Sequence, residues 1–308
     1  MTLLYKADPA RGQAWQVLFA EAAPDLPFRL WPDAGDLADI RYLAAWQPSA
    51  DLVASLPNLE VIFSIGAGVD QFDMDAIPPS VSVVRMVEPG IVQGMVEYAV
   101  FATLALHRHM LDYVEAQRQT RWSPIRLVPA GERRVGVLGL GNLGRAVIER
   151  LKAFGFPLAA WSRSAHAIEG IDGYAGIEQL PAFLPRTDIL ICLLPLTPET
   201  RGILCRESFA MLPRGAGIIN AGRGGHLLEQ DLLEALDNGH LSGAVLDVMA
   251  DEPPAADHPF WHHPRILMTP HIASMTQADS AGRVLIDNIR RHRNGMPMHG
   301  LVRRDLGY

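Results

Sequence analysis

The sequence predicts an α/β protein with two lobes, each built on a parallel sheet that is covered by helices. The length of 308 residues corresponds to about two domains. Short apolar runs alternate with amphipathic stretches along the chain, which is typical of parallel strands connected by helices. A polar, proline-marked stretch separates two blocks of this alternation, and the second block begins abruptly at Arg133.

The first block contains apolar runs that predict strands and amphipathic segments that predict helices. The expected strands are Leu3–Tyr5, Arg41–Ala45, Val61–Ile65 and Val81–Arg85, and the expected helices are Gln13–Ala22 and Leu52–Leu56. From about Val92 to Arg118 the pattern contains no proline and only Gly94, so it predicts one long helix. The polar segment Arg121–Pro129 is expected to form a loop or an arm.

The second block repeats the alternation with more strands. The expected strands are Arg134–Leu138, Leu158–Trp161, Ile189–Leu193, Gly217–Ile219, Gly243–Asp247 and Ile266–Met268. The helices expected between them are Gly144–Phe154, Glu178–Leu184, Arg206–Met211 and Glu229–Leu236. A last helix is expected from about Thr276 to Asn294, and a basic tail follows it.

Composition and charge exclude several classes of protein. Apolar residues make up 49% and charged residues 20%, which is ordinary for a globular protein. The net charge of −7 provides no basic footprint for nucleic acid. The longest apolar runs, such as Ile189–Leu194, are too short to cross a bilayer, and the N-terminus has no secretory signal pattern. Because Cys192 and Cys205 cannot form a disulfide framework, we expect a reducing compartment and hence a cytoplasmic protein. From the charge and the short apolar runs we expect no nucleic-acid or membrane partner.

A glycine pattern typical of dinucleotide binding opens the second block. A buried strand pattern runs into Gly139-Leu140-Gly141-Asn142-Leu143-Gly144 and then into an amphipathic helix. The first glycine permits a tight turn, the second lets a pyrophosphate approach the backbone, and the third lets helix and strand pack closely. The N-terminus of the helix offers N–H groups and partial positive charge to the phosphates. The motif therefore predicts a NAD(P) site.

The residues after the next strand predict which dinucleotide binds. The strand Leu158–Trp161 ends where NAD-binding sites place an acidic residue on the ribose 2′-hydroxyl. Here Ser162, Arg163 and Ser164 follow instead. A guanidinium and hydroxyls bind a 2′-phosphate, which a carboxylate would repel. We therefore expect NADP(H) to be preferred over NAD(H).

The dinucleotide motif places the cofactor domain in the second block, and the family resemblance given below implies its limits. Residues 99–282 are expected to form the NAD(P)-binding Rossmann domain, and residues 1–98 and 283–308 the substrate, or catalytic, domain. The fold would then consist of two Rossmann-like or flavodoxin-like lobes with parallel sheets, with the cofactor domain inserted into the substrate domain.

Ionisable side chains follow three expected strands of the second block, where open α/β sheets place their sites. Arg223 follows one strand, several carboxylates lie between Asp247 and Glu252 after the next, and His271 follows the last. The cation can hold a substrate carboxylate and polarise a carbonyl, the imidazolium can donate a proton, and a carboxylate can fix the imidazole tautomer. This set suits hydride transfer to a 2-oxo acid.

These motifs and their order resemble the D-isomer-specific 2-hydroxyacid dehydrogenase family over nearly the whole chain. The matching segments read GLGNLG, WSRS, LLPLTPETRGIL, NAGRG, LDV, DEPP and PHIAS. The resemblance implies that Arg223 binds the carboxylate and carbonyl of the substrate, that His271 is the acid/base, and that Glu252 is its partner. It favours NADPH-dependent reduction of small 2-oxo acids, namely glyoxylate to glycolate and hydroxypyruvate to glycerate.

The resemblance also implies binding contacts and a quaternary structure. Ala67 and Gly68 would present backbone N–H groups to the substrate carboxylate, which Arg223 and His271 also contact. The implied cofactor contacts are Gly139, Gly141, Asn142, Leu143, Gly144, Ser162, Arg163, Ser164, Leu194, Pro195, Thr200, Ala221, Gly222, Arg223, Asp247, His271, Ala273 and Ser274. Relatives are usually homodimers built through the cofactor domain, with an arm that corresponds here to Arg121–Pro129.

Two other functions stay open. The substrate can be a bulkier 2-oxo acid, such as phenylpyruvate, because the sequence does not give the pocket volume. A non-catalytic dinucleotide-sensing corepressor or scaffold is the alternative from another class, and the presence of Arg223, Glu252 and His271 together argues against it. No metal is expected, because the histidine cluster lacks paired carboxylate or cysteine spacing; its members are His258, His262 and His263.

Overall fold

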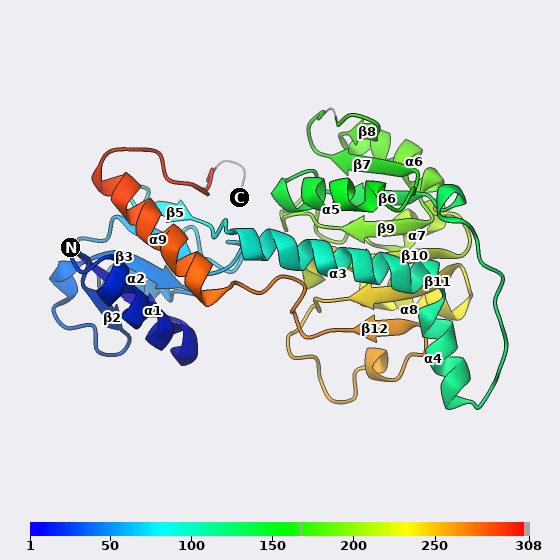
Figure 1. Ribbon diagram of the computed structural model, residues 1–308, viewed down its shortest axis with the longest axis horizontal. Coiled ribbons are helices and arrows are strands. Elements are labelled where there is room, and N and C mark those ends of the chain that lie inside the picture. The colour runs from blue at the N-terminus through cyan, green and yellow to red at the C-terminus, as the bar shows by residue number, and fades with distance from the viewer. Residues whose placement is uncertain (167, 305–308) are drawn as a thin grey trace. The chain divides into compact units, whose positions relative to one another are not determined.

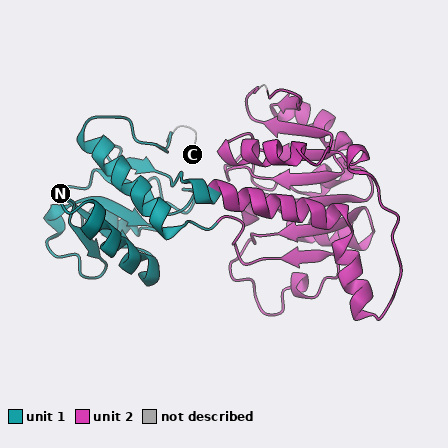
Figure 2. Ribbon diagram, viewed as in Figure 1, with its two compact units in different colours: residues 1–91, 275–308 teal, residues 92–274 magenta. Residues whose placement is uncertain are grey.

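The computed structural model describes residues 1–166 and 168–304, which form two compact units (Figures 1 and 2). Unit 1 contains Met1–Ile91 and the chain from Met275 onward, and unit 2 is Val92–Ser274. Unit 2 is thus inserted into the chain of unit 1. Residues 305–308, the end of the predicted substrate-domain segment 283–308, lie outside the described residues.

The boundaries between the two units lie closer to the ends of two helices than the predicted domain limits do. The expected limits after residues 98 and 282 fall inside α3 (Pro89–His107) and α9 (Ala278–Arg293). Helix α3 packs on unit 2 from Met95 onward. Helix α9 belongs to unit 1 from its first turn, where the Ala278 carbonyl accepts a hydrogen bond from Trp15 Nε1 at 2.6 Å. Each helix therefore lies almost wholly in one unit.

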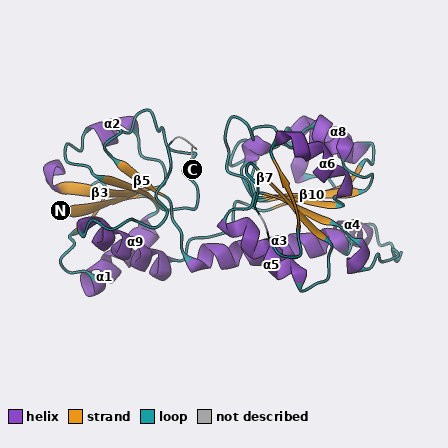
Figure 3. Ribbon diagram, turned by 90° about the horizontal axis from the view of Figure 1, so that it is seen from above, coloured by secondary structure: helices purple, strands orange, loops and turns teal. Residues whose placement is uncertain are grey.

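Unit 1 is a parallel five-stranded sheet with helices on both faces. The strand order is β2-β1-β3-β4-β5, as in flavodoxin-like folds. The strands are β1 (Thr2–Lys6), β2 (Phe28–Leu30), β3 (Ile40–Ala45), β4 (Val61–Ser64) and β5 (Ser82–Val84). Figure 3 shows α1 (Pro9–Ala22) and α9 on one face and α2 (Ala50–Ala54) on the other. The sequence pattern does not predict β2, because this edge strand has three half-buried residues.

Unit 2 is a parallel seven-stranded sheet in the order β12-β11-β10-β9-β6-β7-β8. Its strands are β6 (Val135–Leu138), β7 (Leu158–Ser162), β8 (Asp172–Ala175), β9 (Ile189–Cys192), β10 (Ala216–Asn220), β11 (Leu241–Leu246) and β12 (Ile266–Met268). Read from β8, this is the strand order of dinucleotide-binding sheets. The structure thus confirms the predicted α/β class with two parallel sheets. Strand β8 escapes the sequence pattern because it is a partly exposed edge strand.

Helices cover both faces of this sheet and explain its apolar strands. One face carries α3 and α5 (Asn142–Lys152), and the other carries α6 (Leu180–Phe183), α7 (Arg206–Met211) and α8 (Glu229–Asp237) (Figure 3). Strands β6, β9 and β10 are buried at every position. Parallel sheets covered on both faces have such continuous apolar strands.

The predicted long helix Val92–Arg118 is interrupted. Helix α3 ends at His107, and α4 begins at Met110 and ends at Arg118. Between them His109 adopts a left-handed conformation with φ of 57°, which ends the regular hydrogen bonding of α3. Neither proline nor glycine marks the break, so the prediction of a single helix was wrong for lack of a local signal.

Helix α3 is unusually apolar. Among the described residues it is the one helix whose length and composition would let it cross a membrane, a test that core helices also pass. Met95, Tyr98, Ala99 and Ala102 of α3 pack with strand residues in the core of unit 2. One face of α3 therefore packs in the core of unit 2.

Candidate active site

Three neighbouring strands of unit 2 carry the predicted catalytic residues at their carboxyl ends. Strand β11 pairs with β10 on one side and with β12 on the other, so Asn220, Leu246 and Met268 lie in adjacent register at one sheet edge. Arg223 follows β10, Glu252 follows β11 and His271 follows β12. Because these strands are parallel and adjacent, their loops leave the sheet at the same edge.

His271 and Glu252 form a hydrogen-bonded pair. His271 Nδ1 lies 2.7 Å from Glu252 Oε2, and the two side chains are 34% and 38% exposed. A carboxylate only accepts, so Nδ1 carries a hydrogen and Nε2 is the nitrogen that can exchange a proton with a ligand. The other oxygen, Glu252 Oε1, accepts a hydrogen bond from the backbone N–H of Met249 at 3.0 Å. The carboxylate is therefore held in place before it orients the imidazole.

Asp247 holds the turn that carries His271. Its buried carboxylate accepts from the backbone N–H of Ile272 at 2.9 Å and from that of Ala273 at 2.8 Å. Its carbonyl accepts from the N–H of His271 at 2.9 Å. These bonds support a left-handed backbone conformation at His271, with φ of 54°, which residues other than glycine rarely adopt. Asp247 was predicted as a cofactor contact, and in the structure these three hydrogen bonds join it to the backbone of residues 271–273.

Two residues that the sequence reasoning missed complete this support. Thr269 Oγ1 donates to Asp247 Oδ1 at 2.6 Å, and the Tyr98 hydroxyl lies 2.7 Å from Thr269 Oγ1. Burial is the largest cause that raises the pKa of the Tyr98 hydroxyl above its ordinary value, so the group stays protonated and can donate. Thr269 could be suspected from its place in the TPH segment, whereas Tyr98 lies 171 residues away in sequence and has no such signal.

The Arg223 loop packs against the loop that carries Glu252. A Cβ atom on Gly224 would lie 1.8 Å from the Met249 carbonyl oxygen, so only glycine permits this approach. The backbone of Arg223 is fixed by a hydrogen bond from Asn220 Nδ2 to its carbonyl at 3.0 Å. Its Nη1 donates to the Gly222 carbonyl at 2.8 Å, so one edge of the guanidinium is oriented by its own loop. The structure thus brings the Arg223 loop against the backbone that positions Glu252.

The glycine loop has the geometry that a dinucleotide pyrophosphate needs. Gly139 has φ of 108°, and a Cβ atom on Gly144 would lie 1.9 Å from the Gly139 carbonyl oxygen. A Cβ atom on Gly141 would meet nothing within 4 Å, so there is open space at this backbone. The first turn of α5, including Asn142 and Leu143, has N–H groups without intrahelical acceptors. An anion fits beside them.

The predicted 2′-phosphate segment forms a turn at the end of β7. Ser162 Oγ donates to the Ser164 carbonyl at 2.8 Å, so this hydroxyl shapes the turn. The pKa of Glu199 is held below its ordinary value by a hydrogen bond from Thr197 and, to a smaller extent, by the Arg163 charge. Arg163 therefore lies near Glu199 in the loop that follows β9.

The remaining predicted cofactor contacts lie in the loops that follow β9, β10 and β12. Thr200 Oγ1 donates to the Pro195 carbonyl at 2.7 Å and closes the turn that follows β9. Leu194, Ala221 and Ala273 are buried beside the strands they follow. Gly222 lies next to Leu194, whose carbonyl oxygen would be 3.1 Å from a Cβ atom there. Ser274 ends unit 2.

The predicted substrate loop belongs to unit 1. It follows β4, and Ser64 Oγ donates to the Gly68 carbonyl at 2.7 Å while it accepts from the N–H of Gly66 at 3.2 Å. These bonds curl the loop around the Ser64 hydroxyl. Ala67 lies half-buried inside this turn.

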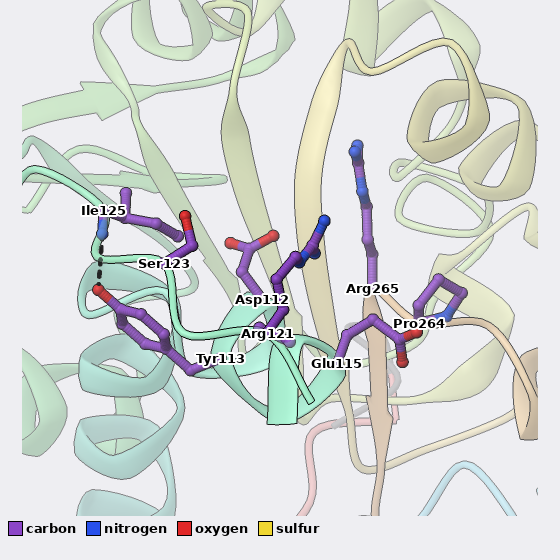
Figure 4. A pocket seen from close by; sticks show the side chains of 9 residues that line it. Asp112, Tyr113, Glu115, Arg121, Ser123, Ile125, Pro264 and Arg265 are labelled. Atoms are coloured by element: carbon purple, nitrogen blue, oxygen red, sulfur yellow. Dashed lines mark hydrogen bonds between the residues drawn. The ribbon is translucent and has the colours of Figure 1, made fainter. Parts of the chain in front are cut away.

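A cavity of about 360 Å³ lies elsewhere in unit 2 (Figure 4). Side chains of α4, of the arm and of the residues just before β12 line it, among them Asp112, Tyr113, Arg121 and Arg265. The Tyr113 hydroxyl accepts from the N–H of Ile125 at 2.9 Å, so the arm is bonded to α4. The cavity is at the amino ends of the strands and contains none of the predicted catalytic residues.

Within the described ranges, no group of three or more His, Cys, Asp and Glu side chains is arranged to hold a metal ion. The histidines of the predicted surface cluster have other contacts. His258 lies 3.1 Å from Glu229, and His263 lies 3.4 Å from Asp237.

Comparison with known proteins places this geometry in a family. Residues 100–273 match the sequence profile described as "D-isomer specific 2-hydroxyacid dehydrogenase, NAD binding domain". The glyoxylate/hydroxypyruvate reductase A of Serratia proteamaculans is 38% identical over 314 residues, with 100% of both chains covered.

Solved structures agree. A D-isomer specific 2-hydroxyacid dehydrogenase from Xanthobacter autotrophicus, in complex with NADPH and MES, has a TM-score of 0.94 and 37% identity, with 100% of this chain and 99% of that chain covered. The NADPH-dependent glyoxylate/hydroxypyruvate reductase of Sinorhizobium meliloti, in complex with NADP and sulfate, has a TM-score of 0.92 and 35% identity, with 100% and 99% covered. The chain therefore belongs to the D-isomer-specific 2-hydroxyacid dehydrogenase family.

Proposed function

We propose that the protein reduces small 2-oxo acids with NADPH, converting glyoxylate to glycolate and hydroxypyruvate to glycerate. The observation that carries this proposal is the His271–Glu252 pair at 2.7 Å, on the loops next to Arg223 at the carboxyl edge of a dinucleotide-binding sheet. The reductases of Serratia and Sinorhizobium support the choice of substrates through their similarity over the full chain.

Arg223 would hold the substrate. A guanidinium forms two-pronged hydrogen bonds with a carboxylate, and its remaining charge polarises the adjacent carbonyl. The hydrogen bond from Nη1 to Gly222 and the fixed backbone of Arg223 limit its freedom before substrate binds. We also assign the backbone N–H groups of Ala67 and Gly68 to the substrate carboxylate, on the strength of the family resemblance.

His271 would donate the proton. Glu252 keeps the hydrogen on Nδ1 and stabilises the charged imidazolium, so Nε2–H is the group that protonates the carbonyl oxygen during reduction. The Asp247 carboxylate sets the backbone of the turn and hence the direction of the ring. Proton donation and carbonyl polarisation by this chain's residues would therefore act on the same substrate oxygen.

Unit 2 would bind the cofactor. NADPH, when bound, supplies the hydride. The open space at Gly141 and the free N–H groups of α5 would hold the pyrophosphate. Arg163 and Ser164 would bind the 2′-phosphate, and Leu194, Pro195 and Thr200 would form the wall beside the adenosine.

The test is NADPH oxidation, followed by absorbance, with a panel of 2-oxo acids. The proposal expects the highest kcat/KM for glyoxylate and hydroxypyruvate, and a lower value for pyruvate and phenylpyruvate. A preference for phenylpyruvate would assign a bulkier substrate. NADPH binding without turnover of any acid would overturn the enzymatic proposal and favour a sensing role.

We further propose that the protein is a cytoplasmic homodimer built through unit 2. The support is the apolar surface of α3, α4 and the arm, where Phe101 is 53% and Trp122 is 100% exposed. Other exposed apolar side chains of this surface are Met110, Val114, Ile125 and Leu127. Sedimentation equilibrium is expected to give twice the chain mass, and a monomer at all concentrations would contradict the assignment.

A further inference from the structure

A fully buried histidine lies between the Arg223 loop and the turn that follows β9. His226 is 0% exposed. The backbone N–H of Arg223 donates to its Nδ1 at 3.0 Å, and its Nε2 lies 3.2 Å from the Pro195 carbonyl oxygen. Because the N–H of Arg223 faces Nδ1, this nitrogen accepts, and the ring hydrogen lies on Nε2 toward the Pro195 carbonyl. One ring therefore bonds to both loops. Burial lowers the pKa of the imidazole, but its contact with Cys192 outweighs burial and raises that pKa.

The two bonded loops serve different ligands in the proposed function. Arg223 is the proposed substrate residue, and the Pro195 turn is the proposed wall of the cofactor site. The Pro195 carbonyl accepts from Thr200 Oγ1 as well as from the imidazole. The ring also fills the space beneath the Arg223 loop, because a Cβ atom on Gly222 would lie 3.0 Å from it.

The backbone of His226 is anchored independently of its side chain. Its carbonyl accepts from the N–H of Leu204 at 2.9 Å, and the Gly225 carbonyl accepts from the N–H of Gly202 at 3.0 Å. An isolated parallel bridge pairs Leu204 with Leu227. A substitution that preserves the size of the side chain would leave these bonds in place, so the imidazole link can be tested on its own.

We propose that His226 is a positioning residue whose two nitrogens serve the two ligands separately. Nδ1 fixes the backbone of Arg223 and hence substrate binding, and Nε2 fixes the Pro195 turn and hence NADPH binding. This inference rests on the proposed function, because it takes Arg223 as the substrate residue and the Pro195 turn as part of the cofactor site. A buried N–H left without an acceptor is costly, so the Arg223 loop is expected to relax when Nδ1 is lost.

Three variants separate the two bonds. His226→Leu removes both, and we expect kcat/KM for glyoxylate to fall about tenfold or more and the Kd of NADPH to rise. His226→Asn retains an acceptor at the place of Nδ1 and loses the Pro195 bond. It should keep KM for glyoxylate near the wild-type value while Kd for NADPH rises. His226→Gln retains a donor toward Pro195 and should show the reverse.

A matched control comes from the other edge of the same sheet. His240 directly precedes β11, and its Nε2 lies 2.7 Å from the Phe209 carbonyl oxygen. His240→Leu also removes one bond between an imidazole and a carbonyl, and it should change the melting temperature without changing KM or Kd. If the His226 variants behave like this control, or if Asn and Gln have equal effects on both ligands, His226 is only a core residue and the inference fails.

The failure of the proposed function gives a different result. Fluorescence titration of NADPH needs no turnover. If the wild type binds NADPH and reduces none of the acids, the proposed function fails, whereas the ratio of NADPH affinities between the Asn and Gln variants still decides the role of Nε2. Equal affinities in those two variants would overturn the inference whatever the substrate.

Discussion

The two edges of the seven-stranded sheet use charged side chains in opposite ways. At the amino edge, Asp188 accepts three hydrogen bonds from Arg134, from its N–H at 2.8 Å, Nε at 3.0 Å and Nη2 at 2.7 Å. These groups bond to each other and join the starts of β6 and β9. At the carboxyl edge, His271 Nδ1 lies 2.7 Å from Glu252 Oε2, and these two side chains come from loops that follow different strands.

The way in which charged side chains are held distinguishes the functional edge of this sheet from the structural edge. Both edges contain arginine, histidine and carboxylates, so residue type alone does not distinguish them. At the amino edge the charges neutralise one another and stabilise the fold. At the carboxyl edge, Arg223, Glu252 and His271 stand on three separate loops that are fixed by hydrogen bonds to the backbone, which is the arrangement that binds a ligand. Substitutions at the carboxyl edge should therefore change kinetics, and those at the amino edge should change stability.

The largest effect is expected for His271→Ala. The variant loses the proton donor, and general acid catalysis contributes about 10²–10⁴-fold, so kcat for glyoxylate should fall by that range. NADPH binding and the melting temperature should change little, because the ring is partly exposed. Steady-state kinetics and a fluorescence titration measure both.

The matched control is His263→Ala. This histidine pairs with Asp237 near the start of β12, at the amino edge. Its kcat is expected to equal that of the wild type. Equal losses of kcat in the two variants would remove the distinction between the edges.

Arg223→Lys should give the next largest effect. Lysine keeps the charge but loses the planar pair of donors, and a hydrogen bond to a charged group contributes about 1.5–3 kcal/mol. We expect kcat/KM for glyoxylate to fall about tenfold to a hundredfold, since about 1.4 kcal/mol is tenfold, with a higher KM and a lower kcat. Arg134→Lys at the amino edge should lower the melting temperature and leave KM unchanged. Wild-type kinetics in Arg223→Lys would refute the substrate contact.

The sequence predicted most of the carboxyl edge because its signals are local. Apolar runs locate the strands, and Arg223 and His271 each follow such a run directly. The supports escaped prediction because they depend on distant contacts. His226 lies three residues from Arg223 but derives its role from Pro195, which is 31 residues away. Tyr98 reaches Thr269 from α3, and the break at His109 depends on a backbone conformation that no glycine or proline marks.

The preference for NADPH over NADH is expected to depend on residues at the carboxyl end of β7, in the same sheet. A guanidinium on a 2′-phosphate contributes about 1.5–3 kcal/mol, which is a preference for NADPH over NADH of about tenfold to a hundredfold. Arg163→Ala should erase most of this preference by weakening NADPH. Adding Ser162→Asp should go further, because a carboxylate repels the phosphate and accepts the ribose hydroxyls of NADH. The measurement is the ratio of kcat/KM values for the two cofactors at fixed glyoxylate. Equal use of both cofactors by the wild type would contradict this interpretation of the segment.

The smallest effect is expected for Asp188→Asn, a substitution at the amino edge of the same sheet. The Asp188 side chain is 16% exposed and that of Arg134 is 38% exposed, so solvent screens part of their attraction. We expect the free energy of unfolding at neutral pH to fall by about 1–2 kcal/mol, with kcat unchanged. Thermal unfolding and glyoxylate kinetics on the same preparation measure the two quantities.

The pH dependence of that stability loss identifies its cause. Burial raises the pKa of the Asp188 carboxyl, but the hydrogen bonds from Arg134 outweigh burial and hold the pKa below its ordinary value of 3.8. A group whose pKa is lower in the folded state stabilises the fold above the unfolded-state pKa, and this contribution disappears as the pH falls through the folded-state pKa. The difference in melting temperature between the wild type and Asp188→Asn should therefore be full at neutral pH and shrink as the pH falls below 3.8. A difference that stays constant over this range would assign the loss to packing instead of charge, and a fall in kcat without a loss of stability would place function at the amino edge as well.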